Sequence, residues 1–233
     1  VLDRANAALQ EAQRRLLSEL ELERKRLARE IHDQVIQDLL AVGYRLEELE
    51  SGPAVTPSLE DELQSVRSDV RKLVSDLRHI CGELRPPTID SLGLGPALQS
   101  FVHGWSNRTG IVVDLALDPN LGRLPEATEL SIFRIVQEGL NNVRKHAGAS
   151  RVDVRLEHTS PRRLLLSIAD DGRGVPADFD LLQLSAEGHY GLSGVSERVA
   201  LLGGRLKIRN QPESGALLQA EIPHPRVEPI ASD

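Results

Sequence analysis

A heptad pattern of apolar residues between positions 59 and 84 constrains the fold more than any other feature of the sequence. The apolar residues follow one another in alternating steps of four and three: Leu59, Leu63, Val66, Val70, Leu73, Leu77, Ile80 and Leu84. This spacing predicts an amphipathic helix whose apolar seam packs against other helices. A hairpin of two helices would leave one side of the seam in water, so we expect two copies of the chain to form a four-helix bundle with twofold symmetry.

The residues before this helix predict its partner in the hairpin. Residues 1 to 50 contain no proline and one glycine, Gly43, and their apolar side chains recur among Glu and Arg, which predicts one long amphipathic helix. The segment 51 to 57 interrupts it, and Thr56 followed by Pro57 suits the N-cap and first turn of the second helix. We therefore expect a signalling coiled-coil helix over 1–24 and a dimerisation domain, built as an antiparallel helical hairpin, over 25–87.

The pattern changes after Arg85-Pro86-Pro87, where the prolines end the helix. The glycine-rich residues 88–97 predict a linker. Beyond it we expect helices near 96–109, 125–147 and 192–202 and strands at 111–117, 151–157, 164–169, 205–209 and 216–222. The last strands are too close for helical crossovers, so the predicted class is α plus α/β: the hairpin, then an α/β sandwich with a mixed or antiparallel sheet over 98–224, and a loose tail at 225–233.

The composition excludes several classes of function. A formal net charge of -7 and the lack of a basic patch argue against direct nucleic-acid binding. The single cysteine, Cys81, cannot form an internal disulfide, and no stretch approaches the roughly 20 apolar residues that cross a bilayer, so we expect a soluble, cytoplasmic fragment. Because the chain begins with Val1 inside a helix and has no methionine, we expect an upstream part to be missing, where a sensory region or membrane anchor could lie.

The first candidate for chemistry is His32, on the flank of the first helix and facing solvent. The buried stripe of that helix is marked by Ile31, Val35, Leu39, Val42 and Leu46. A neutral imidazole is a good nucleophile toward phosphorus, and Asp33 could accept its proton or orient the ring. Gln37, four residues after Asp33, lies on the same face of an α-helix and could position a water. An ordinary surface histidine would look the same in isolation.

A second group of polar residues, on the helix near 125–147, suits a phosphorylated ligand. Glu138, Asn142 and Lys145 stand at i, i+4 and i+7, beside His146. Carboxylate and amide oxygens are ligands that suit Mg²⁺, and lysine supplies a point charge for phosphate oxygens. A solvated helix face would also show this pattern.

Two glycine-containing motifs complete the set. Asp170 ends an apolar strand, where its carboxylate could accept a hydrogen bond from an exocyclic amine, and Gly172 and Gly174 allow close approach of the backbone to a flat ligand. The last motif opens the helix near 192 and consists of Gly191, Leu192, Ser193 and Gly194. Free amides at such a helix start suit phosphate, and the residues between 174 and 188 suit a mobile lid. An acidic hairpin turn and a plain helix cap are the structural alternatives.

Taken in order, these motifs resemble the H, N, G1 and G2 boxes of two-component sensor histidine kinases. The resemblance is to the subfamily of the nitrate sensors and the bacillar membrane-fluidity thermosensor, and it includes Leu84-Arg85-Pro86-Pro87 and Leu202-Gly203-Gly204. It implies a phosphoacceptor hairpin joined to an ATP-binding sandwich of the gyrase and histidine-kinase type. His189 departs from the glycine that many of these kinases have at that position.

The resemblance also implies roles and partners. His32 would be phosphorylated, with Asp33 as its proton acceptor, and Asn142 would bind Mg²⁺ with Glu138 close by. Lys145 and His146 would face the phosphates of ATP, Asp170 would face the adenine amine, and the pocket would be shaped by Gly172, Gly174, Gly191 and Gly194. The spacing from Asp33 to Gln37 resembles the motif for dephosphorylating the partner regulator. A homodimeric kinase that acts on the receiver domain of a response regulator, and also dephosphorylates it, is therefore expected.

Two other functions fit parts of the sequence. A serine kinase or chaperone-like ATPase of the same fold would not need His32 beside Asp33 on a dimerising hairpin. An inactive scaffold would not need Glu138, Asn142 and Asp170 together.

Overall fold

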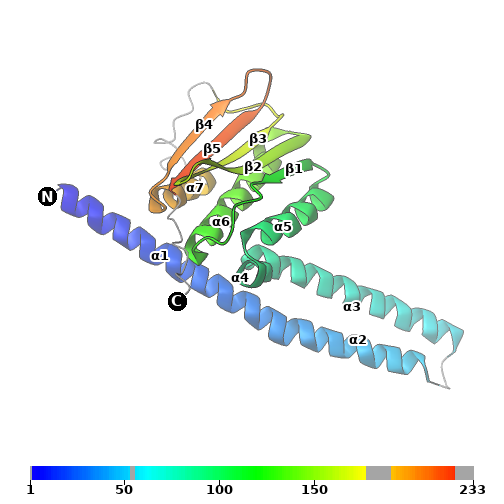
Figure 1. Ribbon diagram of the computed structural model, residues 1–233. Helices are drawn as coiled ribbons and strands as arrows, with labels where there is room; N and C mark the ends of the chain where they lie inside the picture. The colour runs from blue at the N-terminus through cyan, green and yellow to red at the C-terminus, as the bar shows by residue number, and fades with distance from the viewer. Residues whose placement is uncertain (1, 53–55, 177–189, 224–233) are drawn as a thin grey trace, which may run out of the picture. The chain divides into compact units, whose positions relative to one another are not determined.

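The computed structural model (Figure 1) describes residues 2–52, 56–176 and 190–223. The contacts divide the chain into two compact units, Val1–Pro87 and Thr88–Asp233. Within these described residues, no helix combines the length and the apolar character that a membrane crossing requires.

The first unit is a hairpin with two long helical arms. The first arm consists of α1 (Leu2–Glu30), η1 (Ile31–Ile36) and α2 (Gln37–Glu50), and the second arm is α3 (Pro57–Leu84). The hydroxyl of Thr56 accepts a hydrogen bond from the amide of Leu59 at 3.4 Å, which confirms the predicted N-cap. The first arm is one long helix, as predicted, but its η1 segment is a π-helix, which we did not predict.

The core of the hairpin is small. Ile36, Val74 and Cys81 are buried, and Ile31, Leu39, Leu40 and Leu77 pack around them. The thiol of Cys81 on α3 donates to the carbonyl of Ala28 on α1 at 3.5 Å, and burial raises the pKa of that thiol. Near the turn, Arg67 pairs with Glu50 at 2.9 Å between Nη1 and Oε2. These contacts join α3 to the part of the first arm between Ala28 and Glu50, and Cys81 acts as a small apolar core residue.

The predicted heptad seam divides into an inward and an outward stripe. The outward positions of α3 are Leu59, Val66, Leu73 and Ile80, and those of the first arm are Leu20, Leu27, Val35, Val42 and Leu49. Val35 and Val42, which we expected in the buried stripe, are exposed in the single chain. The outward residues recur every seven positions except for a step of eight from Leu27 to Val35, because the π-helical segment adds a residue and brings Ile36 into the core.

The second unit is a five-stranded mixed sheet covered on one face by helices (Figure 1). Its strands are β1 (Val112–Leu117), β2 (Arg151–Ser160), β3 (Arg163–Asp170), β4 (Arg205–Asn210) and β5 (Ala216–Pro223), in the order β1-β2-β3-β5-β4. Strands β1 and β2 pair in parallel and the other neighbours pair antiparallel, so of the two predicted alternatives the sheet is mixed. The covering helices are α5 (Leu94–Thr109), α6 (Glu126–Asn142) with its extension η2 (Val143–Ala147), and α7 (Tyr190–Leu201).

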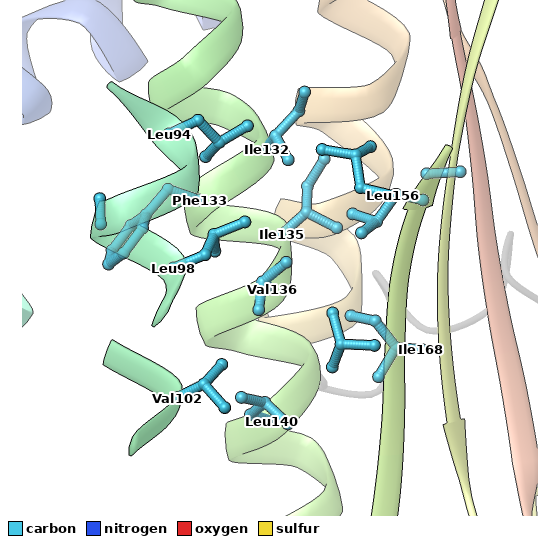
Figure 2. Packing of buried hydrophobic residues seen from close by; sticks show 14 of the residues in the cluster. Leu94, Leu98, Val102, Ile132, Phe133, Ile135, Val136, Leu140, Leu156 and Ile168 are labelled. Atoms are coloured by element: carbon cyan, nitrogen blue, oxygen red, sulfur yellow. The ribbon is translucent and has the colours of Figure 1, made fainter. Parts of the chain in front are cut away.

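Helix α6 contacts α5, α7 and β3, and Figure 2 shows its buried side chains pointing toward α5 and toward the strands. Phe133 points toward α5, where its ring meets Phe101 edge to face at a centroid distance of 5.2 Å. Ile135 points toward the strands, on the side of Leu156. A Cβ atom on Gly139 would lie 2.5 Å from Cδ1 of Ile168, so this glycine lets α6 approach β3 closely. The helix that carries the predicted polar residues is thus held on both sides.

The structure corrects the predicted linker over 88–97. Most of this segment is helical, in α4 (Pro87–Leu92) and the first turn of α5. Ile89 and Leu94 are buried in the core of the second unit. The glycines of this segment indicated a linker between the domains, but burial of these apolar side chains makes the segment part of the second unit.

Candidate functional site

His32 presents an exposed imidazole with one ring nitrogen engaged. Its side chain is 56% exposed, and its Nδ1 lies 3.1 Å from Oδ1 of Asp33. When Nδ1 carries the ring hydrogen it donates to this carboxylate, and the lone pair then sits on Nε2, which meets no hydrogen-bond partner among the described residues. This geometry leaves a nucleophilic nitrogen open to an incoming electrophile.

Gln37 is exposed at the start of α2, and Asp33 is exposed in η1. The predicted shared face assumed α-helical spacing, whereas the residues between them are π-helical. Both side chains are nevertheless accessible from solvent.

The polar residues of the second predicted group lie where α6 passes into η2. Glu138 and Asn142 are half-buried on α6, whereas Lys145 and His146 are on the π-helical η2, where Lys145 is exposed. The prediction that these residues share one helix face assumed α-helical spacing, and this spacing holds only as far as Asn142, where α6 ends. The side-chain nitrogen of Asn142 is buried and has no hydrogen-bond partner in the part of the chain that the structure describes. Such an orphaned amide indicates that a ligand or water completes this site.

Asp170 is the last residue of β3 and only 7% exposed. Its Oδ1 accepts a hydrogen bond from the amide of Gly172 at 2.9 Å, and no described residue donates to its second carboxylate oxygen. A Cβ on Gly172 would lie 2.4 Å from the carbonyl oxygen of Ala147, and the amide of Arg173 donates to that carbonyl at 3.0 Å. The loop after β3 therefore meets the end of η2, so two of the predicted groups come together at one edge of the sheet.

Sequence reasoning missed Asp171 as a site-building residue. Its Oδ1 accepts hydrogen bonds from the amides of Ser150 at 2.8 Å and Arg151 at 3.0 Å, and its Oδ2 accepts from the hydroxyl of Ser150 at 2.6 Å. These bonds hold the pKa of the Asp171 carboxyl below its usual range, with the hydroxyl of Ser150 as the largest cause. Asp171 thereby ties the loop after β3 to the start of β2.

The turn between β4 and β5 was also missed. The side-chain amide of Gln211 donates to the carbonyl of Asp170 at 2.7 Å, and the hydroxyl of Ser214 donates to that of Asp171 at 3.3 Å. The carboxamide of Asn210 accepts from the amide of Val175 at 2.7 Å and donates to the carbonyl of Val175 at 2.9 Å. No local motif could have indicated these contacts, because they depend on the antiparallel pairing of β3 with β5.

The last predicted motif falls in the first turn of α7. Leu192 is half-buried and packs against the core of the unit, and a Cβ on Gly194 would meet no atom within 4 Å. Gly191 follows Tyr190, the first residue of the helix. Of the predicted lid, only residues 175 and 176 are among the described residues. The rest of the lid, Gly188 and His189 lie outside them. In the described part of the chain, no three His, Cys, Asp or Glu side chains are grouped to hold a metal.

Comparisons with known proteins match each unit to a family. Residues 23–89 match the family described as histidine kinase, and residues 127–226 match the family of histidine kinase-, DNA gyrase B-, and HSP90-like ATPases. The second match implies that this unit binds ATP.

Curated relatives carry both units together. The signal transduction histidine-protein kinase/phosphatase DegS of Brevibacillus brevis is 36% identical over 206 residues, which is 87% of this chain and 52% of DegS. The sensor histidine kinase MctS of Rhizobium johnstonii is 31% identical over 231 residues, 97% of this chain and 48% of MctS. The chain thus spans about half the length of these relatives.

A solved structure shows the same fold. The histidine kinase domain of the blue-light activated histidine kinase of Erythrobacter litoralis EL346 superposes with a TM-score of 0.51 at 21% identity, covering 81% of this chain and 94% of that domain. The two family matches follow each other along the chain in the same order as the sequence motifs, and both curated relatives are histidine kinases. The chain belongs to the two-component sensor histidine kinases.

Proposed function

We propose that this chain transfers the γ-phosphoryl group of ATP to His32, and from there to an aspartate of a response regulator. The observation that carries the proposal is the exposed imidazole of His32 with its Nδ1 bonded to Asp33, on a hairpin of the histidine kinase family. The Nε2 lone pair would attack phosphorus in line while the bond from phosphorus to the ADP oxygen breaks. Asp33 would take up the proton that the phosphorylated ring releases from Nδ1.

The ATP site would lie at the edge of the sheet where the loop after β3 meets η2. The free carboxylate oxygen of Asp170 would accept a hydrogen bond from the adenine amine, and Lys145 and His146 would face the phosphates. The remaining contacts would come from the backbone around Gly172, Gly174, Gly191, Leu192 and Gly194. The buried position of Asp170, with one oxygen engaged and one open, supports this assignment.

Mg²⁺ fits the residues beside this site. Glu138 and Asn142 offer oxygen ligands. The orphaned side-chain nitrogen of Asn142 is a hydrogen-bond donor, so it would face an acceptor such as a phosphate oxygen rather than the cation. When bound, the ion would supply positive charge to the phosphates. Mg²⁺ usually takes few protein ligands and completes its shell with water and phosphate oxygens, so a site with two protein ligands suits it.

The outward apolar stripes of the hairpin support a homodimer. The stripe on α3 presents one exposed apolar side chain at each heptad, such as Leu73, and would pack against a second copy in a four-helix bundle. The accessible pair Asp33 and Gln37 would act on the receiver domain of the regulator, with Gln37 placing the water that removes its phosphate. We place the reaction in the cytoplasm, where ATP is available.

Incubation with Mg²⁺ and γ-labelled ATP tests the proposal. We expect an acid-labile, base-stable label on the protein, which His32→Gln abolishes. His79→Gln, which removes an exposed histidine of the same hairpin, is the matched control and should keep the label. A label that persists in His32→Gln, or an acid-stable label of the kind that phosphoserine gives, would overturn the assignment.

A further inference from the structure

The turn between β4 and β5 is bonded to the loop after β3 at several points. Gln211 holds the carbonyl of Asp170, Ser214 holds that of Asp171, and Asn210 holds both polar groups of the Val175 peptide. Gln211 is half-buried and its amide also reaches the carbonyl of Ala216 at 3.4 Å. One short turn therefore fixes the backbone on both sides of the glycine-rich loop.

Two glycines make this contact close. Gly215 has φ of +86°, and a Cβ there would lie 1.7 Å from the carbonyl oxygen of Asp170. Gly174 has φ of +77°, and a Cβ there would lie 2.4 Å from Oδ1 of Asn210. Any other residue at either position would be strained by its backbone angle and would push the turn and the loop apart.

The carboxylate of Asp170 has little else to orient it. Among the described residues its side chain accepts one hydrogen bond, from the amide of Gly172 two residues away in the same loop. The direction of the open carboxylate oxygen therefore depends on how the loop backbone is held. The bond from Gln211 acts on the peptide of Asp170 itself, since it engages the carbonyl of that residue.

We propose that Gln211 is a positioning residue for base recognition, which sets the direction of the Asp170 carboxylate toward the adenine amine, with Asn210 holding the other end of the loop. This inference rests on the proposed ATP site. Neither Gln211 nor Asn210 touches the nucleotide in this assignment. Their effect is on selectivity for adenine over guanine, because guanine has a carbonyl oxygen where adenine has its amine and the carboxylate repels that oxygen.

The test is calorimetric titration of the whole chain with ATP and with GTP in the presence of Mg²⁺. Gln211→Leu removes the donor, and Gln211→Glu replaces it at nearly the same size with an acceptor that repels the carbonyl. We expect either variant to lower the ratio of ATP affinity to GTP affinity by about tenfold, the effect of one lost hydrogen bond to a buried carbonyl. Asn210→Asp, which keeps the acceptor and loses the donor, should lower it less.

Gln219→Leu is the matched control, because Gln219 is a half-buried glutamine on β5 whose amide reaches Ser167 rather than the loop. It should leave the ratio unchanged. If Gln211 had a purely structural role, its loss would reduce the fraction of protein that can bind nucleotide. This reduction would lower the measured stoichiometry for ATP and GTP equally and would leave the ratio of the two affinities unchanged. An unchanged ratio in both Gln211 variants would overturn the inference.

The wild-type chain and Asp170→Asn separate this failure from failure of the ATP site. If the wild type binds ATP and Asp170→Asn removes its preference for ATP, the site stands whatever Gln211 does. If the wild type fails to bind ATP, or Asp170→Asn keeps the full preference, the site and the inference both fail.

Discussion

Asp171 differs from its neighbour Asp170 in what its carboxylate binds. Asp170 keeps one oxygen open, whereas both oxygens of Asp171 accept hydrogen bonds from Ser150 or Arg151. The two adjacent aspartates at the end of β3 thus have different roles. Asp170 is available to a ligand, and Asp171 binds the loop to the start of β2. The sequence indicated the first role through its glycine pattern and carried no sign of the second, because the partners of Asp171 lie about 20 residues earlier in the chain.

The lowered pKa of Asp171 predicts a specific acid dependence of stability. A carboxyl whose pKa is lower in the folded than in the unfolded state stabilises the fold above its unfolded pKa of about 3.9, and this stabilisation is lost as pH falls through the lower folded value. We expect the midpoint of thermal unfolding of the ATP-binding unit to fall less steeply with acid in Asp171→Asn than in the wild type. Glu157→Gln, which removes an exposed carboxyl on β2, is the control. Equal slopes for Asp171→Asn and the wild type below about pH 4 would contradict the prediction.

At the level of elements, Gly139 decides how closely α6 approaches β3. Alanine in place of a helical glycine normally stabilises by about 1 kcal/mol, but overpacking a filled core costs about 1 to 3 kcal/mol. Because the Cδ1 methyl of Ile168 is buried and 2.5 Å from the new Cβ, we expect Gly139→Ala to destabilise the unit by about 1 kcal/mol.

The sign should reverse when that methyl is removed. In the Ile168→Val background the next atoms of the side chain lie 3.8 Å from the new Cβ, so Gly139→Ala should stabilise by up to about 1 kcal/mol. Urea unfolding of the two single variants and the double variant measures this coupling. Additive effects would show that α6 moves to accept the new carbon.

The helices and strands show how much of the fold can be predicted from the periodicity of apolar residues. The heptad steps in α3 and the cap at Thr56 predicted that helix correctly, because both signals are local. The π-helical turn at His32 was missed, although the step of eight between Leu27 and Val35 is visible in the sequence, because a single helical period was assumed throughout. Helix α4 was missed because burial of Ile89 in the second unit outweighs the local glycine and proline signals.

At the scale of the whole molecule, the chemistry is divided between two compact units. The proposed nucleophile, His32, lies in the hairpin, and the residues proposed to bind ATP lie in the sandwich. The hairpin has a small core and outward apolar stripes that suit a second copy, whereas the sandwich has a large core of its own. The stability of the hairpin should therefore depend on protein concentration, and the stability of the sandwich should depend on nucleotide.

Calorimetry of the full chain should separate these responses. We expect two unfolding transitions. The midpoint temperature of one transition should rise with ATP, because the ligand binds only the folded sandwich. ATP at 100 times its dissociation constant stabilises the folded sandwich by about 2.7 kcal/mol. The midpoint temperature of the other transition should rise with protein concentration, because a dimer dissociates as it unfolds. His32→Gln should leave both responses intact, since it removes only the proposed phosphoacceptor. A single transition that rises with ATP and ignores protein concentration would contradict a dimeric hairpin, because nothing in that unit would then depend on a second copy.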